Sequence, residues 1–210
     1  MNDVIKLINN IKNSPVNKII EQRMKEFEEL GERSSREIFK ELCFCLLTAN
    51  FNALGGIKIQ EEIGDGFLYM SQKDLAKKLS ELGHRFPNTR AKFIFEARRF
   101  KENLKEKLST FDTEEQMRIW LIENIKGFGM KEASHFLRNI GYKDIAIIDF
   151  HIINFLVKHN LIRFQKKSSL SIKKYLEIEN ILRELADKTG LSLGELDLYL
   201  WYAETGKVLK

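Results

Sequence analysis

Apolar residues recur at spacings of three and four along almost the whole chain, which is the pattern of amphipathic helices. The first such segment, which ends at Ser14-Pro15, has its apolar positions at Val4, Leu7, Ile8 and Ile11. A longer segment, with Phe93, Ala97 and Leu104 on its apolar face, predicts one continuous helix from Asn88 to Leu108. We expect roughly ten helices in all.

Helix starts are marked by a short polar residue that an acidic residue follows three positions later. The side-chain oxygen of the first residue can accept a backbone N–H of the first turn, and the acidic residue can reach back. Four pairs of this kind precede apolar stretches: Ser34 with Glu37, Ser71 with Asp74, Asp112 with Glu115, and Ser192 with Glu195. Each pair therefore predicts where a helix begins.

Two segments depart from the helical pattern. Ile145–Asp149 resembles a short strand, but a single strand has no partner in a helical chain, so we expect an extended connector that leads into a helix. The segment from Arg163 to Ser171 is polar and basic, and we expect a surface loop, with a position near phosphates as the alternative.

Composition narrows the class of protein. Hydrophobic residues make up 43% of the 210 positions, and no apolar run approaches the ~18 to 20 residues of a membrane span. Two prolines and 12 glycines are few for an all-β sandwich or barrel. We therefore expect an all-α protein without a membrane partner. The first ten residues lack the pattern of an export signal, which predicts a cytoplasmic protein that is not secreted.

The formal charge is +5, which suits a polyanionic partner, although most basic residues alternate with acidic ones. Cys43 and Cys45 are the only cysteines and lie in an apolar run. Two neighbouring cysteines without distant partners exclude a disulfide framework, an iron–sulfur site and a cysteine-based zinc site. We expect both to be small buried residues.

The candidate chemistry begins between Leu121 and Ser134, where one amphipathic helix ends and another starts around Gly127-Phe128-Gly129. Two glycines allow a tight turn and a close approach of the backbone to a neighbouring group. The free amides at the start of the second helix would suit a phosphate. An ordinary turn between helices explains the same pattern, so it does not decide the function alone.

Lys131 and Asp149 add to this pattern. Lys131 falls in the first turn of the second helix, and Asp149 follows the apolar connector just before a further helix. A lysine amine becomes a nucleophile when its neutral form is favoured, as it is near a helix start or other cations. Taken separately, Lys131 could be a solvated lysine and Asp149 a helix cap.

Taken together, Gly127-Phe128-Gly129-x-Lys131 and Ile148-Asp149-Phe150-His151 resemble the helix-hairpin-helix motif and catalytic-aspartate loop of the base-excision DNA glycosylases. In that superfamily a lysine directly after the hairpin marks the bifunctional members, which also cleave the strand. The resemblance therefore implies that Lys131 is the nucleophile and Asp149 the catalytic aspartate. Thr48–Ala53 and Arg85–Lys92 are similar to further segments of the same superfamily.

The resemblance also implies the architecture. We expect two helical subdomains with the hairpin at the cleft between them. Residues 31–144 would form a helical barrel, with the hairpin at about 118–140. Residues 1–30 and 145–210 would form the second subdomain, which carries Asp149 and a C-terminal helix at the base pocket.

The branch follows from the cysteines and the C-terminus. Most endonuclease III-like and adenine-specific members carry four cysteines for an iron–sulfur cluster, and this chain has no cysteine after Cys45. Its small size, the Thr48–Asn52 segment and the segment Leu198–Lys210 resemble the short archaeal-type 8-oxoguanine DNA glycosylases with AP-lyase activity. The expected partner is double-stranded DNA that contains an oxidised base, and a monomer would suffice.

Roles for further residues come from this resemblance. Gly127, Gly129 and His151 would contact the DNA backbone, and Asn50 would fill the space that the flipped base leaves. Lys210, Trp201 and Phe86 would recognise the base. The expected chemistry requires no metal or organic cofactor, although relatives hold a monovalent cation at the hairpin.

Two alternatives remain at this stage. The same Lys131 and Asp149 would serve a glycosylase/lyase for another oxidised base equally well. A non-catalytic helix-hairpin-helix module would bind DNA through its glycines alone, with the placement of both side chains a coincidence.

Overall fold

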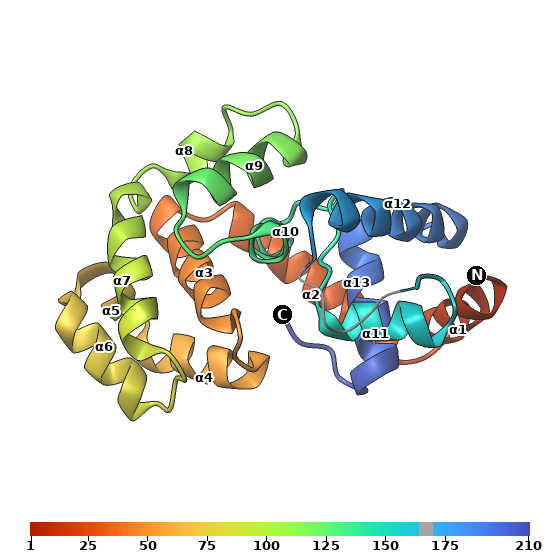
Figure 1. Cartoon of the computed structure of the whole chain (residues 1–210), viewed down its shortest axis with the longest axis horizontal. Helices are drawn as coiled ribbons and strands as arrows, with labels where there is room; N and C mark the ends of the chain where they lie inside the picture. The colour runs from red at the N-terminus through yellow and green to blue at the C-terminus, as the bar shows by residue number, and fades with distance from the viewer. Residues whose placement is uncertain (164–169) are drawn as a thin grey trace.

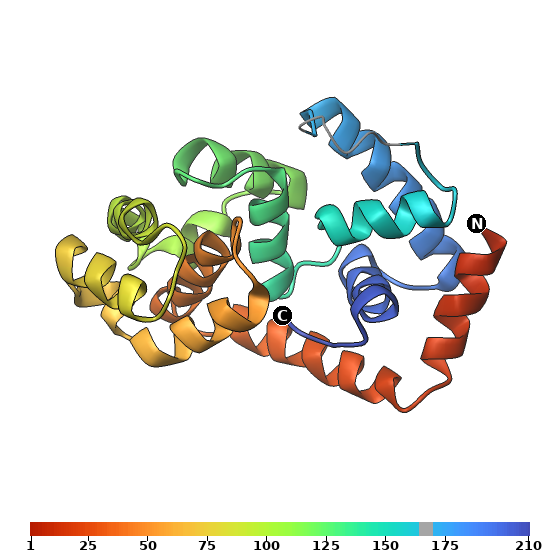
Figure 2. The ribbon, with the colours of Figure 1, turned by 60° about the horizontal axis from the view of Figure 1, so that its bottom comes forward.

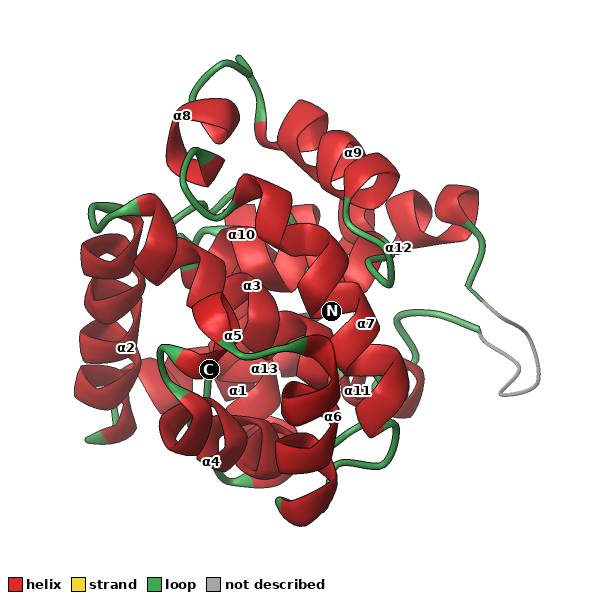
Figure 3. Ribbon diagram, turned by 90° about the vertical axis from the view of Figure 1, so that its left-hand side faces the viewer, coloured by secondary structure: helices red, strands yellow, loops and turns green. Residues whose placement is uncertain are grey.

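The protein is described here by a computed structural model that covers residues 1–163 and 170–210. Across these residues it has thirteen α-helices, one 3-10 helix and no strand, so the expected all-α class is confirmed (Figure 3). None of the helices in this part of the chain is long and apolar enough to cross a bilayer. Most of the predicted basic loop, residues 164–169, lies outside the described part.

The first seven helices are α1 (Asn2–Lys12), α2 (Val16–Gly31), α3 (Ser35–Thr48), α4 (Ala53–Ile63), α5 (Gly66–Tyr69), α6 (Gln72–Glu81) and α7 (Pro87–Ala97). The remaining elements are the 3-10 helix η1 (Arg98–Phe100), α8 (Leu104–Leu108), α9 (Glu114–Asn124), α10 (Met130–Asn139), α11 (Phe150–Lys158), α12 (Ile172–Thr189) and α13 (Leu193–Thr205). The expected number of about ten is too low for the described residues. Short helices such as α5 have too few turns to show a period.

Three of the four predicted helix starts are confirmed. The hydroxyls of Ser34, Ser71 and Ser192 each accept the backbone N–H three residues later. Only at Ser192 does the acidic residue return to the backbone of the cap, since Glu195 accepts the Ser192 N–H at 2.8 Å. The start at Asp112 is wrong by one residue. Thr113 caps α9, and the Asp112 N–H instead donates to the side chain of Gln116.

The continuous helix expected from Asn88 to Leu108 is also wrong. The structure divides it into α7, η1 and α8. Arg98 turns away to donate to the carbonyl oxygens of Phe67 and Met70. The N–H of Lys105, in the first turn of α8, donates to the hydroxyl of Ser35 on α3 at 2.9 Å. Partners distant in sequence therefore stabilise a break that the apolar period does not reveal.

Two hydrophobic clusters organise the helices. The central cluster is built from α3 to α10 and ends at Ile145, with Phe39, Phe44, Phe67 and Phe136 fully buried. The terminal cluster is built from α1, α2, the connector and α11 to α13. Figures 1 and 2 show the helices of these clusters in two groups, with α10 at the boundary and the C-terminus in the gap between the groups. Cys43 and Cys45 are fully buried in the central cluster, as expected.

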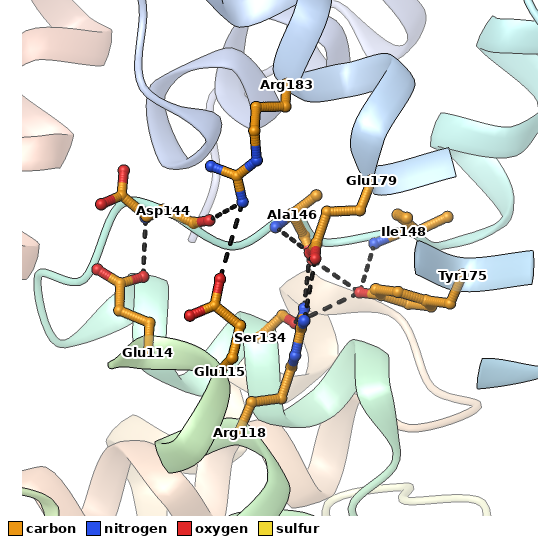
Figure 4. Close-up of polar contacts among 10 residues, drawn as sticks. All are labelled: Glu114, Glu115, Arg118, Ser134, Asp144, Ala146, Ile148, Tyr175, Glu179 and Arg183. Atoms are coloured by element: carbon orange, nitrogen blue, oxygen red, sulfur yellow. Dashed lines mark hydrogen bonds and ion pairs between the residues drawn. The ribbon is translucent and has the colours of Figure 1, made fainter. Parts of the chain in front are cut away.

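A buried polar network joins the two clusters (Figure 4). Arg118 on α9 donates to both carboxylate oxygens of Glu179 on α12, at 2.6 and 2.9 Å. The pair is buried, with at most 5% of either side chain exposed. A bidentate pair of this kind fixes orientation as well as distance, so it sets how the two clusters meet.

The extended connector predicted at Ile145–Asp149 is confirmed, and the same network satisfies its backbone. The Ala146 N–H donates to Glu179 at 2.8 Å. The hydroxyl of Tyr175 donates to the Ala146 carbonyl and accepts the Ile148 N–H. Because side chains of α12 replace a partner strand, a buried extended segment can exist in a helical protein. The connector delivers Asp149 to the start of α11.

Candidate active site

A cavity of about 660 Å³ lies where the two clusters meet. Its walls come from the segment after α3, from α10, from the start of α11, from α13 and from the C-terminal segment. Six of the residues singled out in the sequence line it: Asn50, Lys131, Asp149, His151, Trp201 and Lys210. A concave, mixed apolar and polar cavity of this size is typical of a small-molecule or base-binding site.

The hairpin between α9 and α10 positions Lys131. Gly127 has a φ of +94°, and a Cβ there would lie 2.4 Å from the Phe93 ring, so only glycine fits this turn. Phe128 is buried and anchors the turn in the central cluster. Helix α10 then starts at Met130, which places Lys131 in its first turn, half-buried in the cavity wall. Neither hairpin glycine lines the cavity.

Gly129 is the N-cap residue of α10, and its own N–H donates to the carboxylate of Glu132 at 3.2 Å. The amides of the first helical turn have no partner within the helix, as at any helix start. An anion at the hairpin could use these amides, whereas the Gly129 amide becomes available only if Glu132 turns away. The contact of Glu132 was not predicted from the sequence, although a glutamate three residues after a glycine cap suggests it.

Asp149 occupies the N-cap position of α11, where its Oδ1 accepts the Ile152 N–H at 2.9 Å. The cap interpretation of this residue is therefore correct, and it does not exclude a role in the cavity, which Asp149 also lines. Lys131 and Asp149 thus belong to the first turns of two helices from different clusters, and both helix starts border the same cavity.

Charged groups that the sequence did not single out surround this pair. Arg138 on α10 and Asp197 on α13 also line the cavity, and Arg138 Nη2 lies 3.5 Å from Asp197 Oδ2. Burial raises the pKa of Asp197 to about 6, with a further increase from Asp149 that Arg138 and Lys131 oppose. The spacing of Lys131 and Arg138 along one helix face and that of Asp197 and Trp201 were the available signals.

His135 lies one turn after Lys131 on the same face of α10. Burial lowers the pKa of His135 well below its usual value, and the cations Lys131, Arg138 and Lys210 lower it further. The imidazole is therefore neutral at pH 7. Its edge-on contact with Phe44, with the ring centroids 5.8 Å apart, holds it against the central cluster.

Aromatic rings form one side of the cavity. The Trp201 ring meets the His151 ring edge-on at a centroid distance of 4.6 Å. The centroids of the Phe150 and His151 rings are 3.8 Å apart. Phe150 is 64% exposed beside the cavity, which is unusual for a large apolar side chain. Such a surface suits the face of a nucleobase or a sugar.

Asn50 is exposed at the cavity rim, one residue after the C-cap of α3. Its φ of +60° is the left-handed conformation that often follows the end of a helix, so the backbone of Asn50 also turns the chain away from α3. Its backbone surroundings are fixed, because Arg90 donates to the carbonyl oxygen of Ala49 at 2.6 Å. A His84 ring nitrogen lies 3.0 Å from the Leu47 carbonyl oxygen.

Phe86 is the one predicted base-recognition residue that does not line the cavity. It precedes α7, is 38% exposed, and lies beneath the Arg85 guanidinium, whose carbon is 5.0 Å from the ring centroid. Sequence adjacency to the basic segment did not determine the direction of this side chain.

Lys210 lines the cavity, but its ammonium group is engaged elsewhere. Nζ lies 2.8 Å from Glu41 Oε2, contacts Gln60 Oε1, and sits 4.3 Å from the centroid of the Phe44 ring. Among the described residues there is no group of three or more His, Cys, Asp or Glu side chains that could hold a metal ion. Burial raises the pKa of both cysteine thiols.

Proteins of known function are similar in sequence to this chain. A family model described as 8-oxoguanine DNA glycosylase matches residues 20–191. An 8-oxoguanine DNA glycosylase/AP lyase of Korarchaeum cryptofilum is 56% identical, over 100% of this chain and 97% of the relative.

Solved structures give the same result. The Methanocaldococcus jannaschii 8-oxoguanine glycosylase/lyase in complex with 15mer DNA containing 8-oxoguanine has a TM-score of 0.95 and 54% identity, with 99% of each chain covered. The 8-oxoguanine DNA glycosylase of Thermotoga maritima has a TM-score of 0.92 and 45% identity, over 100% of this chain and 99% of the other. The helical fold implied by the sequence resemblance is confirmed.

Proposed function

This chain belongs to the 8-oxoguanine DNA glycosylase family, and we propose that it removes 8-oxoguanine from DNA through a Schiff base on Lys131. It is an enzyme of the 8-oxoguanine DNA glycosylase/AP lyase type. The observation that supports the mechanism is the cavity in which an amine and a carboxylate, Lys131 and Asp149, are held at two helix starts from different clusters.

The substrate is DNA, and the reacting carbon, C1′, is inaccessible while the base is stacked in the duplex. The nucleotide must therefore be flipped into the cavity, at a cost of about a few kcal/mol. Asn50, exposed at the rim on a fixed backbone, would fill the vacated space. A single chain provides the whole cavity, so the protein would act as a monomer. We propose that it acts in the cytoplasm, on double-stranded DNA.

In the proposed reaction the neutral amine of Lys131 attacks C1′, and the bond between C1′ and the base breaks with its electron pair on the base. The base takes up one of the two protons of the lysine nitrogen and leaves as a neutral molecule. The lone pair of this nitrogen then expels the ring oxygen O4′, which takes up a proton from water, and a protonated imine between C1′ and Lys131 results. Water removes a C2′ proton, and the 3′ phosphate departs by β-elimination with the electron pair of its bond to C3′. Asp149 would stabilise the positive charge that develops on the sugar.

The DNA backbone would be held by the hairpin and by the start of α11. Amides of the turn at Gly127 and Gly129 would bind phosphate oxygens at the positive end of α10. His151, in the first turn of α11, would add a further backbone contact. The Gly129 amide is occupied by Glu132, so this contact requires Glu132 to turn away when a phosphate arrives.

Base discrimination depends on one hydrogen atom. The N7 of 8-oxoguanine carries a proton and donates, whereas the N7 of guanine accepts. A buried acceptor that faces N7 would be left without a donor by guanine, at a cost of about 1 to 3 kcal/mol. We propose Trp201 as the stacking residue and Lys210 as part of the wall that distinguishes the two bases. Phe86 would meet the DNA outside the cavity.

The chemistry of a lysine nucleophile needs no metal or organic cofactor. A monovalent cation at the hairpin would be held by backbone carbonyl oxygens. Those of Ile125 and Gly129 already accept the N–H groups of Phe128 and Ala133, and each retains a second lone pair for a cation. Such an ion would support a phosphate contact and take no part in the reaction.

The test is reductive trapping. The protein is incubated with borohydride and duplexes that contain one 8-oxoguanine, thymine glycol or uracil, and the covalent protein–DNA species is measured. Borohydride reduces only an imine to a stable bond, so a crosslink reports the Schiff base. We expect it with 8-oxoguanine alone, because only that base would be removed. A crosslink with a different lesion would retain the mechanism and overturn the substrate. DNA binding without any crosslink would favour a non-catalytic module.

A further inference from the structure

Glu41 is a buried carboxylate in the middle of α3, with only 2% of its surface exposed. Its neighbours along the helix, Leu42 and Cys43, are fully buried apolar residues of the central cluster. A carboxylate in such a place is strongly destabilising unless it is paired and hydrogen-bonded. The proposed reaction gives it no role, so the identity of its partners matters.

Three groups meet the carboxylate of Glu41. Its Oε1 accepts from Asn139 Nδ2 at 2.6 Å, and its Oε2 accepts from Gln60 Nε2 at 3.0 Å. Its Oε2 also accepts from the ammonium of Lys210 at 2.8 Å. Asn139 and Gln60 belong to helices of the central cluster, whereas Lys210 follows α13 of the terminal cluster. The only cation in this group therefore comes from across the cavity.

The pocket for the Lys210 side chain is complete. An ammonium has three donors, and here Glu41 and Gln60 accept from it while the Phe44 ring presents its face at 4.3 Å. The side chain of Lys210 is 18% exposed, which is low for a lysine. This is a specific binding site for one side chain of the same chain.

The segment that Lys210 anchors has few other attachments. Helix α13 ends at Thr205, its C-cap Gly206 has a φ of +70°, and residues 207–210 continue without helical structure. Within the described part of the chain, no backbone–backbone hydrogen bond holds residues 207–210, and Val208 packs on the terminal cluster. Yet Lys207, Leu209 and Lys210 form part of the cavity wall. Figures 1 and 2 both show this segment crossing the gap between the helix groups.

We propose that Glu41 is a positioning residue that docks Lys210 across the cavity, and that this contact fixes residues 207–210 as the wall against which the flipped base is read. The inference rests on the proposed function. The ammonium of Lys210 then binds Glu41 and not the base. The base contacts other parts of residues 207–210, which this ion pair holds in place. A displacement of about 1 Å in such a wall can lower a rate on the order of 100-fold.

The test compares Glu41→Gln with Glu61→Gln, an exposed residue on α4 that undergoes the same loss of charge. NMR order parameters of the backbone amides of residues 207–210 are measured without DNA, and single-turnover excision of 8-oxoguanine is measured separately. For Glu41→Gln we expect the order parameters of this segment to fall from the rigid range of about 0.85 to below about 0.6. We expect excision to slow on the order of 100-fold. Borohydride trapping on DNA with a preformed abasic site should be unchanged, because no base has to be held. Glu61→Gln should match the wild type.

A second pair of variants separates anchoring from direct contact with the base. Lys210→Gln leaves Glu41 buried without a counter-charge, whereas Glu41→Gln combined with Lys210→Gln places two neutral amides face to face. We expect the double variant to regain the order parameters of residues 207–210 and most of the excision rate. If it stays as slow as Lys210→Gln, the ammonium acts on the base and the positioning role is wrong.

Further outcomes are equally decisive. Gln60→Ala removes one partner of Lys210 at a half-buried position, so it reports on the anchor if Glu41→Gln does not fold. Lower order parameters with unchanged excision, or slower excision with unchanged order parameters, would overturn the proposal. Failure of the wild type to trap any DNA would instead overturn the proposed function, while the order parameters would still report on the Glu41–Lys210 contact.

Discussion

The two clusters contribute different members of the proposed catalytic pair to the cavity. The wall from the central cluster carries Lys131 and Arg138 on α10, together with the carboxylate of Glu132. The wall from the terminal cluster carries the carboxylates Asp149 and Asp197, together with Lys207 and Lys210 after α13. Each wall therefore holds both signs of charge, but Lys131 and Asp149 come from different clusters. This pair borders one cavity only while the clusters meet in this orientation.

The clusters also differ from the junction between them. Each cluster is an apolar core, which favours compaction but tolerates small rotations of one core against another. The junction instead uses directional contacts, above all the bidentate pair of Arg118 and Glu179. A few polar residues therefore set the orientation of the clusters at the cavity. Substitutions in the cavity should change the reaction rate, whereas substitutions at the junction should change the stability of the fold.

The largest effect is expected for the proposed nucleophile, Lys131, in the wall from the central cluster. Lys131→Gln removes the only nucleophile of the proposed mechanism, so borohydride trapping should be abolished while DNA binding persists. Gel-resolved trapping and a binding assay on the same duplex measure the two properties. Lys126→Gln, an exposed lysine in the same hairpin that does not line the cavity, serves as the control. An adduct that persists in Lys131→Gln would assign the nucleophile elsewhere.

The next largest effect is expected for Asp149, in the wall from the terminal cluster. Asp149→Asn retains a good N-cap for α11, so the fold should persist, but it removes the charge that stabilises the sugar cation. We expect single-turnover base removal to slow on the order of 100- to 1,000-fold. Asp144→Asn, at an exposed residue immediately before the connector, controls for the loss of charge. A normal rate in Asp149→Asn would show that the carboxylate is only a cap.

At the junction, we expect a loss of stability. Arg118→Met leaves Glu179 buried without its partner, which should lower the free energy of unfolding by about 3 to 5 kcal/mol. Adding Glu179→Gln removes the unpaired charge and keeps an acceptor for Ala146, so the double variant should lose less. Urea unfolding of both variants measures the difference. Equal losses would mean that the pair does not couple the clusters.

The smallest effect concerns pH. Folded Asp197 has a pKa of about 6, above its ordinary value of 3.8, because burial disfavours its charge. Between these values the folded chain holds more protons than the unfolded chain, so stability falls as the pH rises from about 4 to about 6. Asp197→Asn should remove this component, at most about 3 kcal/mol.

Urea unfolding of the wild type and of Asp197→Asn at pH 4.5 and pH 7 tests this linkage. The variant should gain in stability relative to the wild type as the pH rises. Loss of the contact with Arg138 lowers the stability of the variant at both values and therefore cancels in the comparison. A difference between the proteins that does not change with pH would place the titration of Asp197 at its ordinary value.

Local patterns in the sequence determined the helices and the central pair of the site. Ser192 and Glu195 cap α13 because both partners lie within one helical turn. The apolar period predicted α-helices because it repeats on the scale of a turn. Lys131 and Asp149 were identified because each follows a recognisable local feature, the glycine hairpin and the apolar connector.

Only the tertiary structure decided which distant side chains meet. Arg118 and Glu179 are 61 positions apart, and Lys210 and Glu41 are 169 apart, so no local period relates them. The direction of Phe86, the break after α7, and the places of Arg138 and Asp197 in the cavity follow in the same way from packing between helices. A sequence pattern reports contacts within about one turn, whereas a buried charge finds its partner only when the cores that carry both have packed.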